Sequence, residues 1–370
     1  MNAPPSRPGP ERSEQSAVQI GALVPLSRPG WVEAGWHLLA GLELGAREVN
    51  DAGGIAGRPL ELVIRDTGAD PQRAAAAVDE LAGLGVAAVA GEYHSVVARA
   101  AAARADALGL PFLCSSAVLD ALTEEPTEWV ARLAPAQSHG WQAYADFLLG
   151  AGHRRIAVAT EPSVYWASGT RILRDYLAPR GGTVIELDVR GVAPAAVCDE
   201  LVINRVTVLL LLVGFPEPAV SIVTSVRRDQ RLAEIMIGAP AGQPEFAEWL
   251  ALLGGDSVAI PFLRYRPERL SQLVVRVETA LRERLAEAPS FVAFEGYDTV
   301  AVLADMLRSH GPDRARLAES WPRVAVEGTR GQIQFSRPPG VSVWQWAWAP
   351  TQVVDRDPEQ PDRFRVLHAT

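Results

Sequence analysis

Short apolar runs of strand length alternate along the chain with segments whose apolar residues recur every three or four positions. The runs predict strands at 18–24, 60–65, 86–90, 110–114, 155–160, 183–188, 206–214, 234–238 and 257–261. The amphipathic segments between them predict helices at 36–50, from 71 onward, and at 95–108, 168–177, 193–203, 219–229 and 245–253. Strands that alternate with helices in this way predict parallel sheets covered by helices on both faces.

The alternation breaks once, and the break divides the chain into two α/β units. A less regular stretch at 120–135 separates them, and two longer helices at 267–286 and 290–310 follow the second unit. Single cores stop growing near roughly 250–300 residues, so a chain of 370 residues is expected to form two domains. The closing segments alternate apolar and polar residues and predict an antiparallel ribbon at 331–336, 342–349 and 364–368.

The charge balance excludes a nucleic-acid-binding surface. The chain has 35 Lys and Arg residues against 44 Asp and Glu residues, which gives a net charge of −9. Nucleic-acid binding needs a concentrated positive face, and no dense Lys/Arg cluster reverses this balance locally. The longest apolar run, 206–213, falls well short of the ~20 residues of a membrane-spanning helix, so no membrane-embedded segment is expected.

The N-terminal segment predicts where the chain resides. Residues 1–16 are rich in proline and charge and contain no apolar stretch, which is typical of a disordered tail and not of a secretory signal peptide. The chain as written is therefore expected in the cytoplasm. A leader upstream of this sequence would instead place it in the periplasm or at the cell surface.

Motifs for catalysis, metals and cofactors are absent from the sequence. There is no GxSxG elbow, no phosphate loop and no strand–GxGxxG–helix unit. Cys114 and Cys198 lack CxxC or Cys/His spacing and are expected to be buried thiols. The histidines at 37, 139, 153, 310 and 368 are scattered, and His94 beside Ser95 is a weak nucleophile–base candidate. We therefore expect no enzyme, no metal and no cofactor.

The residues directly after each strand form the candidate site, because ligands bind at the carboxyl ends of the strands in open α/β sheets. Ser95 begins a predicted helix, where its hydroxyl either caps the helix or joins the free N–H groups in holding a carboxylate or amide oxygen. Ser115 and Ser116 carry the same two interpretations. Aromatic residues also follow the strands, as packing or as cavity walls: Tyr93, Tyr165, Trp166 and Phe215.

The sequence resembles a known family from about residue 18 to 368. The string Asn-Asp-Ala-Gly-Gly-Ile-Ala-Gly-Arg-Pro at 50–59 is its most specific mark, and 294–298 and 328–335 also fit. It resembles the type I periplasmic binding proteins of the leucine/isoleucine/valine-binding branch, which includes urea- and amide-binding members. The resemblance implies two doubly wound parallel-sheet lobes joined by a three-segment hinge that closes on a ligand.

The resemblance also implies a domain division and a function. It divides the chain into a tail at 1–16, a first lobe at 17–133 plus 263–330, and a second lobe at 134–262 plus 331–370. The implied function is non-enzymatic binding of a small polar solute in the cleft, as the substrate-binding protein of an ABC transporter with a permease as partner. The alternative is a cytoplasmic ligand sensor that controls a regulator protein, like the family's aliphatic-amide sensor.

Family binding positions can be matched to this chain one by one. Ser95 matches a serine that binds the ligand's carboxylate or amide, and Tyr93 in Gly-x-Tyr-x-Ser is similar to the amide sensor. Ser116-Ala117 matches the next loop, in which Val118 replaces the usual threonine. Aromatic positions of the second lobe are matched by Tyr165 or Trp166, with a one-residue ambiguity, and by Phe215.

One departure from the family bears on the ligand. Amino-acid binders of this family place a glutamate after the strand matched by 235–238, where it pairs with the ligand's ammonium group. The loop at 239–242 reads Ala-Pro-Ala-Gly instead. Because a buried ammonium without a partner is costly, our hypothesis is a neutral amide, a urea-like compound or a carboxylate without an amine.

Overall fold

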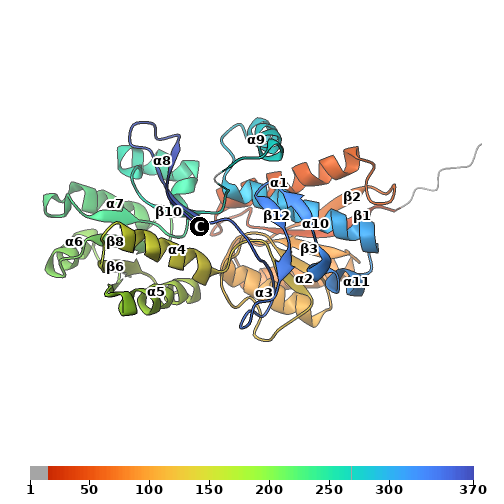
Figure 1. The fold of residues 1–370 in the computed structure, drawn as a ribbon, viewed down its shortest axis with the longest axis horizontal. Helices are drawn as coiled ribbons and strands as arrows, with labels where there is room; N and C mark the ends of the chain where they lie inside the picture. The colour runs from red at the N-terminus through yellow and green to blue at the C-terminus, as the bar shows by residue number, and fades with distance from the viewer. Residues whose placement is uncertain (1–15, 268) are drawn as a thin grey trace, which may run out of the picture.

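The computed structural model describes residues 16–267 and 269–370 and has two lobes side by side along its long axis (Figure 1). The first part of the chain builds one lobe from β1 (Val18–Val24), α1 (Val32–Asp51), β2 (Leu60–Asp66), α2 (Pro71–Gly83), β3 (Ala88–Gly91), α3 (Ser95–Ala107), β4 (Phe112–Cys114) and β5 (Val130–Arg132). The second lobe contains α4 (Gln137–Gly150), β6 (Arg155–Thr160), α5 (Val164–Leu177), β7 (Thr183–Asp188), α6 (Pro194–Ile203), β8 (Val208–Leu212), α7 (Ala219–Arg228), β9 (Met236–Gly238) and α8 (Ala247–Leu253).

The remaining elements are shared between the lobes. They are β10 (Phe262–Arg264), α9 (Gln272–Leu285), α10 (Phe291–His310), α11 (Arg314–Ala318), β11 (Val326–Gly328), β12 (Gly331–Ile333), β13 (Phe335–Ser336), β14 (Trp344–Trp346), β15 (Gln352–Arg356) and β16 (Phe364–Ala369). The chain crosses between lobes three times: after β5, after β10 and after β14 (Figure 1). This confirms the expected fold class of two parallel-sheet lobes with a three-segment hinge.

Each lobe is built on its own sheet. The first sheet has seven strands in the order β13-β14-β5-β4-β3-β1-β2, all parallel except β13. The second has four parallel strands in the order β7-β6-β8-β9. In the first sheet β2 and β3 lie on opposite sides of β1, and in the second β7 and β8 lie on opposite sides of β6. The strand order therefore reverses at β1 and at β6, and α/β sheets bind ligands at such switch points. The small antiparallel sheet β10-β15-β16 packs on α4.

The long helices α1 and α10 pack backbone to backbone in the first lobe. Glycine makes this possible, because a Cβ on Gly41 would overlap the carbonyl oxygen of Ala293 and one on Gly296 would overlap that of Leu38. The pair covers one face of the first sheet and holds the N-terminal end of α1 rigidly at the cleft. Both cysteines are buried free thiols, as expected, and burial raises the pKa of Cys114 to about 12.

The structure corrects three expectations about elements. Only part of the segment 331–370 lies with the second lobe, because β14 pairs with β5 and extends the first sheet. No strand forms at 257–261. A 3-10 turn occupies Gly254–Ser257, and the next strand, β10, begins only at Phe262, where β15 supplies an antiparallel partner. The stretch expected to be irregular contains β5.

Two further findings concern the ends of the sequence and membranes. The expected disordered tail falls on residues 1–15, which lie outside the described residues, and on Ser16. Within 16–267 and 269–370, none of the helices combines the length and the apolar character that crossing a bilayer requires.

Candidate functional site

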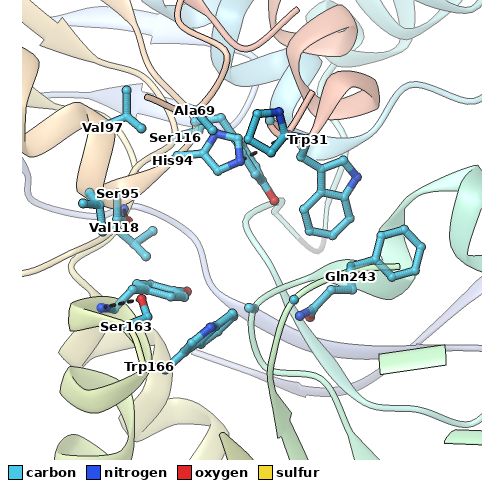
Figure 2. Close-up of a pocket in the computed structure, with 18 of the residues that line it drawn as sticks. Trp31, Ala69, His94, Ser95, Val97, Ser116, Val118, Ser163, Trp166 and Gln243 are labelled. Atoms are coloured by element: carbon cyan, nitrogen blue, oxygen red, sulfur yellow. Dashed lines mark hydrogen bonds between the residues drawn. The ribbon is translucent and has the colours of Figure 1, made fainter. Parts of the chain in front are cut away.

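A cavity of about 470 Å³ lies in the cleft between the two lobes (Figure 2). Its walls include the loops that follow β1, β3 and β4 in the first lobe and β6, β8 and β9 in the second. The expected site residues that line it are Tyr93, Ser95, Ser116, Tyr165, Trp166 and Phe215. These residues lie in the loops that the switch-point rule selected in both lobes.

A buried carboxylate organises the loop after β3. Glu92 accepts hydrogen bonds from the backbone N–H groups of Tyr93 (2.8 Å) and His94 (2.9 Å), and from the hydroxyl of Thr67 (2.7 Å). The His94 ring lies 3.3 Å from the same carboxylate, and its Nε2 accepts the N–H of Trp31. These bonds direct the Tyr93 ring into the cavity, a role of Glu92 that no sequence motif indicated.

Ser95 binds the protein as well as facing the cavity. Its hydroxyl oxygen accepts the backbone N–H groups of Val118 (3.2 Å) and Leu119 (3.3 Å), so it holds the loop after β4 rather than capping α3. With both lone pairs used, the hydroxyl retains only its proton to offer a ligand. His94 is bonded elsewhere, so the adjacent His94 and Ser95 do not form a nucleophile–base pair.

The loop after β4 presents one serine to the cavity and buries the other. Ser115 bonds to the hydroxyl of Thr299 (2.8 Å) and is not part of the cavity wall, and Ala117 packs into the core behind it. Successive side chains of an extended segment point in opposite directions, which separates Ser115 from Ser116. Ser116 lines the cavity, and its buried hydroxyl makes no hydrogen bond of normal geometry with a described residue.

The second lobe contributes the first turn of α5. The hydroxyl of Ser163 caps this helix by accepting the N–H of Tyr165 (3.2 Å), and the Gln137 side chain donates to the Tyr165 carbonyl (3.0 Å). Tyr165 and Trp166 both line the cavity with ring centroids 4.7 Å apart. The structure therefore brings both candidates of the one-residue ambiguity to the cavity.

Aromatic rings join the two lobes at one side of the cavity. Trp31, in the loop after β1, stacks on Phe215 of the second lobe with centroids 5.2 Å apart and an angle of 22°. It also contacts Phe246 at 4.8 Å and the edge of Tyr93 at 6.0 Å. The sequence placed Trp31 in a strand-end loop, and that position was the available signal for including it.

Two more polar residues line the cavity and were not expected from the sequence. Tyr265 comes from the crossing segment after β10, and Gln243 from the turn after β9. Burial raises the pKa of Tyr93, Tyr165 and Tyr265, so these three phenols stay neutral hydrogen-bond donors at physiological pH. Gln243 directly follows the loop 239–242, which lacks the glutamate that amino-acid binders use to pair with the ligand's ammonium group.

The charged side chains of the cavity wall neutralise each other at its rim. Arg28 of the first lobe pairs with Glu248 of the second at 3.1 Å, and their side chains are 66% and 31% exposed. Next to them, the Glu33 carboxylate on α1 accepts the N–H groups of Ala247 (2.7 Å) and Glu248 (3.1 Å) at the start of α8. Among the residues that the structure describes, the wall therefore carries no unpaired carboxylate or guanidinium, and these contacts bridge the lobes across the cleft.

A buried ion cluster lies behind Ser116. Arg330 binds Glu295 (3.1 Å) and Asp298 (3.0 Å), and all three side chains are almost completely buried. Burial raises the pKa of Glu295 to about 7, although Arg330 and the nearby Ser116 hydroxyl act in the opposite direction. The cluster places a titratable carboxyl directly beneath the cavity.

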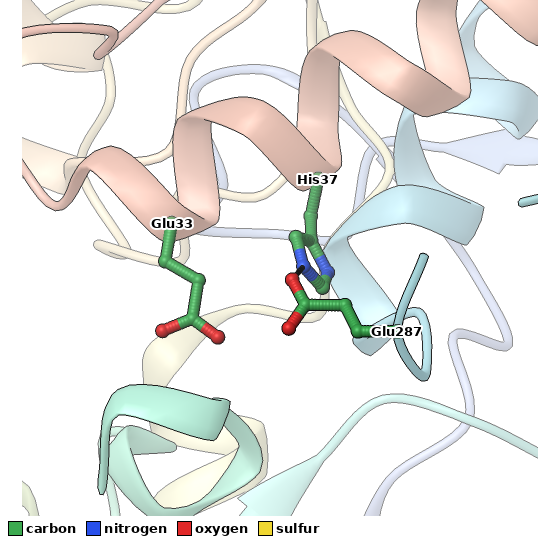
Figure 3. A group of neighbouring side chains, drawn as sticks. All are labelled: Glu33, His37 and Glu287. Atoms are coloured by element: carbon green, nitrogen blue, oxygen red, sulfur yellow. Dashed lines mark hydrogen bonds and ion pairs between the residues drawn. The ribbon is translucent and has the colours of Figure 1, made fainter. Parts of the chain in front are cut away.

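Glu33, His37 and Glu287 form a possible cation site outside the cavity, with their ligand atoms within 4.8 Å of one another (Figure 3). The Nδ1 atom of His37 accepts the backbone N–H of Ser290 (2.9 Å), so the ring proton resides on Nε2. That proton is donated to Glu287 (2.9 Å). His37 thus has no free lone pair to offer a metal in this arrangement.

Comparisons with known proteins agree on the fold. A family model described as "Periplasmic binding protein" matches residues 17–349. The Leu/Ile/Val-binding protein homolog 8 of Brucella abortus (strain 2308) is 29% identical over 177 residues, which is 45% of this chain and 44% of that protein. The alignment thus spans less than half of that relative's length.

Solved structures with low sequence identity share the overall fold. A leucine-binding protein, LivK, from Thermotoga maritima superposes with a TM-score of 0.80 at 18% identity, covering 95% of this chain and 97% of that one. LivJ from Streptococcus pneumoniae, in complex with isoleucine, gives 0.79 at 20% identity, covering 95% and 99%. A solute-binding protein from R. palustris, in complex with benzoate, gives 0.80 at 17% identity, covering 95% and 96%.

Proposed function

The chain belongs to the periplasmic binding protein family, and from this premise we propose that it binds a small polar molecule between its lobes without transforming it. The observation that carries the proposal is the cavity at the switch points of both sheets, enclosed by residues of both lobes. Contacts across the rim, such as Arg28 with Glu248, support closure of the lobes around a ligand. As in other binding proteins, the ligand would then pass to the permease of an ATP-driven importer.

The proposed ligand is a neutral amide, a urea-like compound or a carboxylate without an amine. A zwitterionic amino acid would need a carboxylate to pair its ammonium group, and the carboxylate in the cavity wall, Glu248, already pairs with Arg28. The nearby Glu245 is held by Arg264 (3.0 Å) and by the N–H of Phe291 (3.1 Å). Relatives of the same fold are described with isoleucine and with benzoate, so the fold itself accepts both kinds of ligand.

A second candidate is a ligand sensor that controls a regulator protein. Tyr93 and Ser95, which match the amide sensor in Gly-x-Tyr-x-Ser, both line the cavity. This favours an amide ligand under either function. Co-purification of a regulator with the native protein would support sensing, and reconstituted uptake with a permease would support transport.

A thermal-shift screen tests the proposal directly. The purified protein is heated with amino acids, short amides, ureas and small carboxylates, each far above its dissociation constant. A ligand at 100 times its dissociation constant should add about 2.7 kcal/mol to the free energy of unfolding. We expect the largest shift among amides or ureas.

Two outcomes of this screen would count against the proposal. Tight binding of leucine or valine would contradict the assignment of a ligand without an ammonium group. The absence of a shift with every compound class would contradict small-molecule binding in the cleft.

A further inference from the structure

Gln243 places an unpaired amide in the wall of the cavity. Its side chain is only 1% exposed, yet it forms no hydrogen bond with any described residue, and its Oε1 atom is fully buried. Figure 2 shows this side chain extending from its loop toward the cavity. A buried amide without partners is unfavourable, so this residue points to a hydrogen-bonding group that the ligand supplies.

The backbone that carries Gln243 is fixed on both sides of the residue. Gly242 adopts a left-handed conformation (φ 89°) and donates its N–H to Ala239 (3.1 Å), whose own N–H is bound to Pro261 (2.8 Å). On the other side Glu245 is anchored by its ion pair with Arg264. The backbone that carries the amide is therefore positioned before the ligand arrives.

The chemistry of an amide selects what it pairs with. Gln243 offers a carbonyl acceptor beside an N–H donor, and the group that satisfies both presents N–H beside C=O. A carboxylate would satisfy the donor and repel the acceptor, and an ammonium would do the opposite. The rim ions Arg28 and Glu248 already pair with each other, so they do not favour a charged ligand at this point.

A second polar group lies on the opposite lobe. The Ser116 hydroxyl lines the same cavity and is 5% exposed, and when it donates to the buried Glu295 carboxyl its oxygen stays free to accept a hydrogen bond from a ligand. Gln243 and Ser116 thus provide one open polar contact from each lobe. Between them the wall is aromatic, including Tyr165, Trp166 and Phe291.

We propose that Gln243 recognises the ligand through a pair of hydrogen bonds to a carboxamide or urea N–C=O group, and that this group defines the ligand class. The inference rests on the proposed function and narrows its ligand range. Gln243 acts as the specificity-determining residue, and Ser116 provides the contact on the other lobe.

Isothermal titration with matched probe pairs tests this inference. The probes are acetamide and benzamide, each compared with its carboxylate, together with urea and leucine. We expect the wild-type protein to bind at least one amide or urea about tenfold more tightly than the matched carboxylate or leucine. Gln243→Glu, which keeps the shape and replaces the donor with a second acceptor, should weaken that binding about tenfold or more.

Two variants separate a specific effect from a folding defect. Gln243→Leu should also lose its affinity for the amide probe. Its melting temperature should differ from that of the wild-type protein by no more than that of a surface control variant does. That control is Gln142→Glu on the exposed face of α4, which makes the same chemical change and should leave the affinity unchanged.

The outcomes distinguish this inference from the proposed function. If the wild-type protein prefers a carboxylate or leucine, or if Gln243→Glu binds amides as before, the role of Gln243 is overturned while binding in the cleft stands. If no probe of any class binds to the wild-type protein, the proposed function fails as well.

Discussion

Glu295 shows how one buried carboxyl can make the whole site sensitive to pH. It shares Arg330 with Asp298, so the buried cluster has two acids for one base. Burial raises the pKa of Glu295 to about 7 and also raises that of Asp298. The carboxyl lies beneath Ser116, whose hydroxyl can donate to the ionised form and then offers only its oxygen to the cavity.

The free energy of unfolding should fall as the pH rises from about 4.5 to 7. The folded state keeps the Glu295 proton in this window while the unfolded state has lost it, so deprotonation favours unfolding. The full effect is up to about 3 kcal/mol. Urea denaturation at successive pH values measures it, and Glu295→Gln should flatten the curve.

The slope with pH is the diagnostic quantity, because Glu295→Gln also weakens the pairing with Arg330. The matched control is Glu319→Gln, which removes an exposed carboxyl and leaves the buried cluster intact. A Glu295→Gln curve as steep as that of the control would show that another group titrates.

At the scale of residues, the sequence predicts cavity residues in the first positions after strands of the two parallel sheets and misses two others, Tyr265 and Gln243. Tyr93, Trp166 and Phe215 were found because the carboxyl ends of parallel strands converge at the switch point. Tyr265 comes from a crossing segment, and only the tertiary fold brings it to the cavity. Gln243 lies just past the loop that the family resemblance examined, and its importance depends on its lack of partners, which no sequence pattern encodes.

Helix α8 begins at the cleft, and a residue of the other lobe caps it. The first backbone N–H groups of a helix lack partners within the helix, and Glu33 of α1 accepts those of Ala247 and Glu248. The close backbone packing of α1 against α10, at Gly41 of α1 and Gly296 of α10, fixes the position of α1. Closing the lobes therefore completes α8, which couples a helix terminus to the closed state.

Glu33→Gln should weaken binding of the ligand found in the screen by about fivefold, because a capping contact contributes about 1 kcal/mol to the closed state. The affinity is measured by calorimetry at neutral pH. Burial raises the pKa of Glu33, so this carboxylate becomes protonated as the pH is lowered. The affinity of the wild-type protein should then approach that of the variant.

The control for this variant lies on the same helix. Glu43 pairs with Arg284 within the first lobe, so Glu43→Gln changes the charge of α1 without touching α8. Equal losses of affinity in both variants would attribute the effect to charge and not to closure.

Among the elements, regular alternation was predictable and the edges of the sheets were not. Helix α4 was overlooked although Trp141, Tyr144 and Leu148 have helical spacing, because it directly follows an irregular stretch. Strand β14 is three residues long, and its pairing with β5 is set by the open edge of the first sheet rather than by its own sequence.

At the scale of the whole molecule, one of the four buried apolar clusters of the described residues extends through both lobes. This largest cluster contains Leu42 and Val300 of the first lobe and Val158 of the second, and it includes Trp141 and Leu263 near the crossings. A core that continues through the hinge ties the stability of each lobe to the other.

Thermal unfolding should therefore be a single transition despite the two lobes. Differential scanning calorimetry should give a calorimetric enthalpy that equals the van't Hoff enthalpy. Two resolved peaks would mean that the lobes unfold independently and that the shared core contributes little coupling.

The packing of α1 against α10 also has a consequence for protein synthesis. Asp51 ends α1, but its covering helix begins only at Phe291, so at about 5–20 residues per second the ribosome needs roughly ten to fifty seconds to supply it. The second lobe is nearly contiguous and can fold during that interval. The first lobe leaves the ribosome first but is covered by α10 only after the β6–β9 sheet of the second lobe has been made, and until then the apolar stripe of α1 is exposed to chaperones.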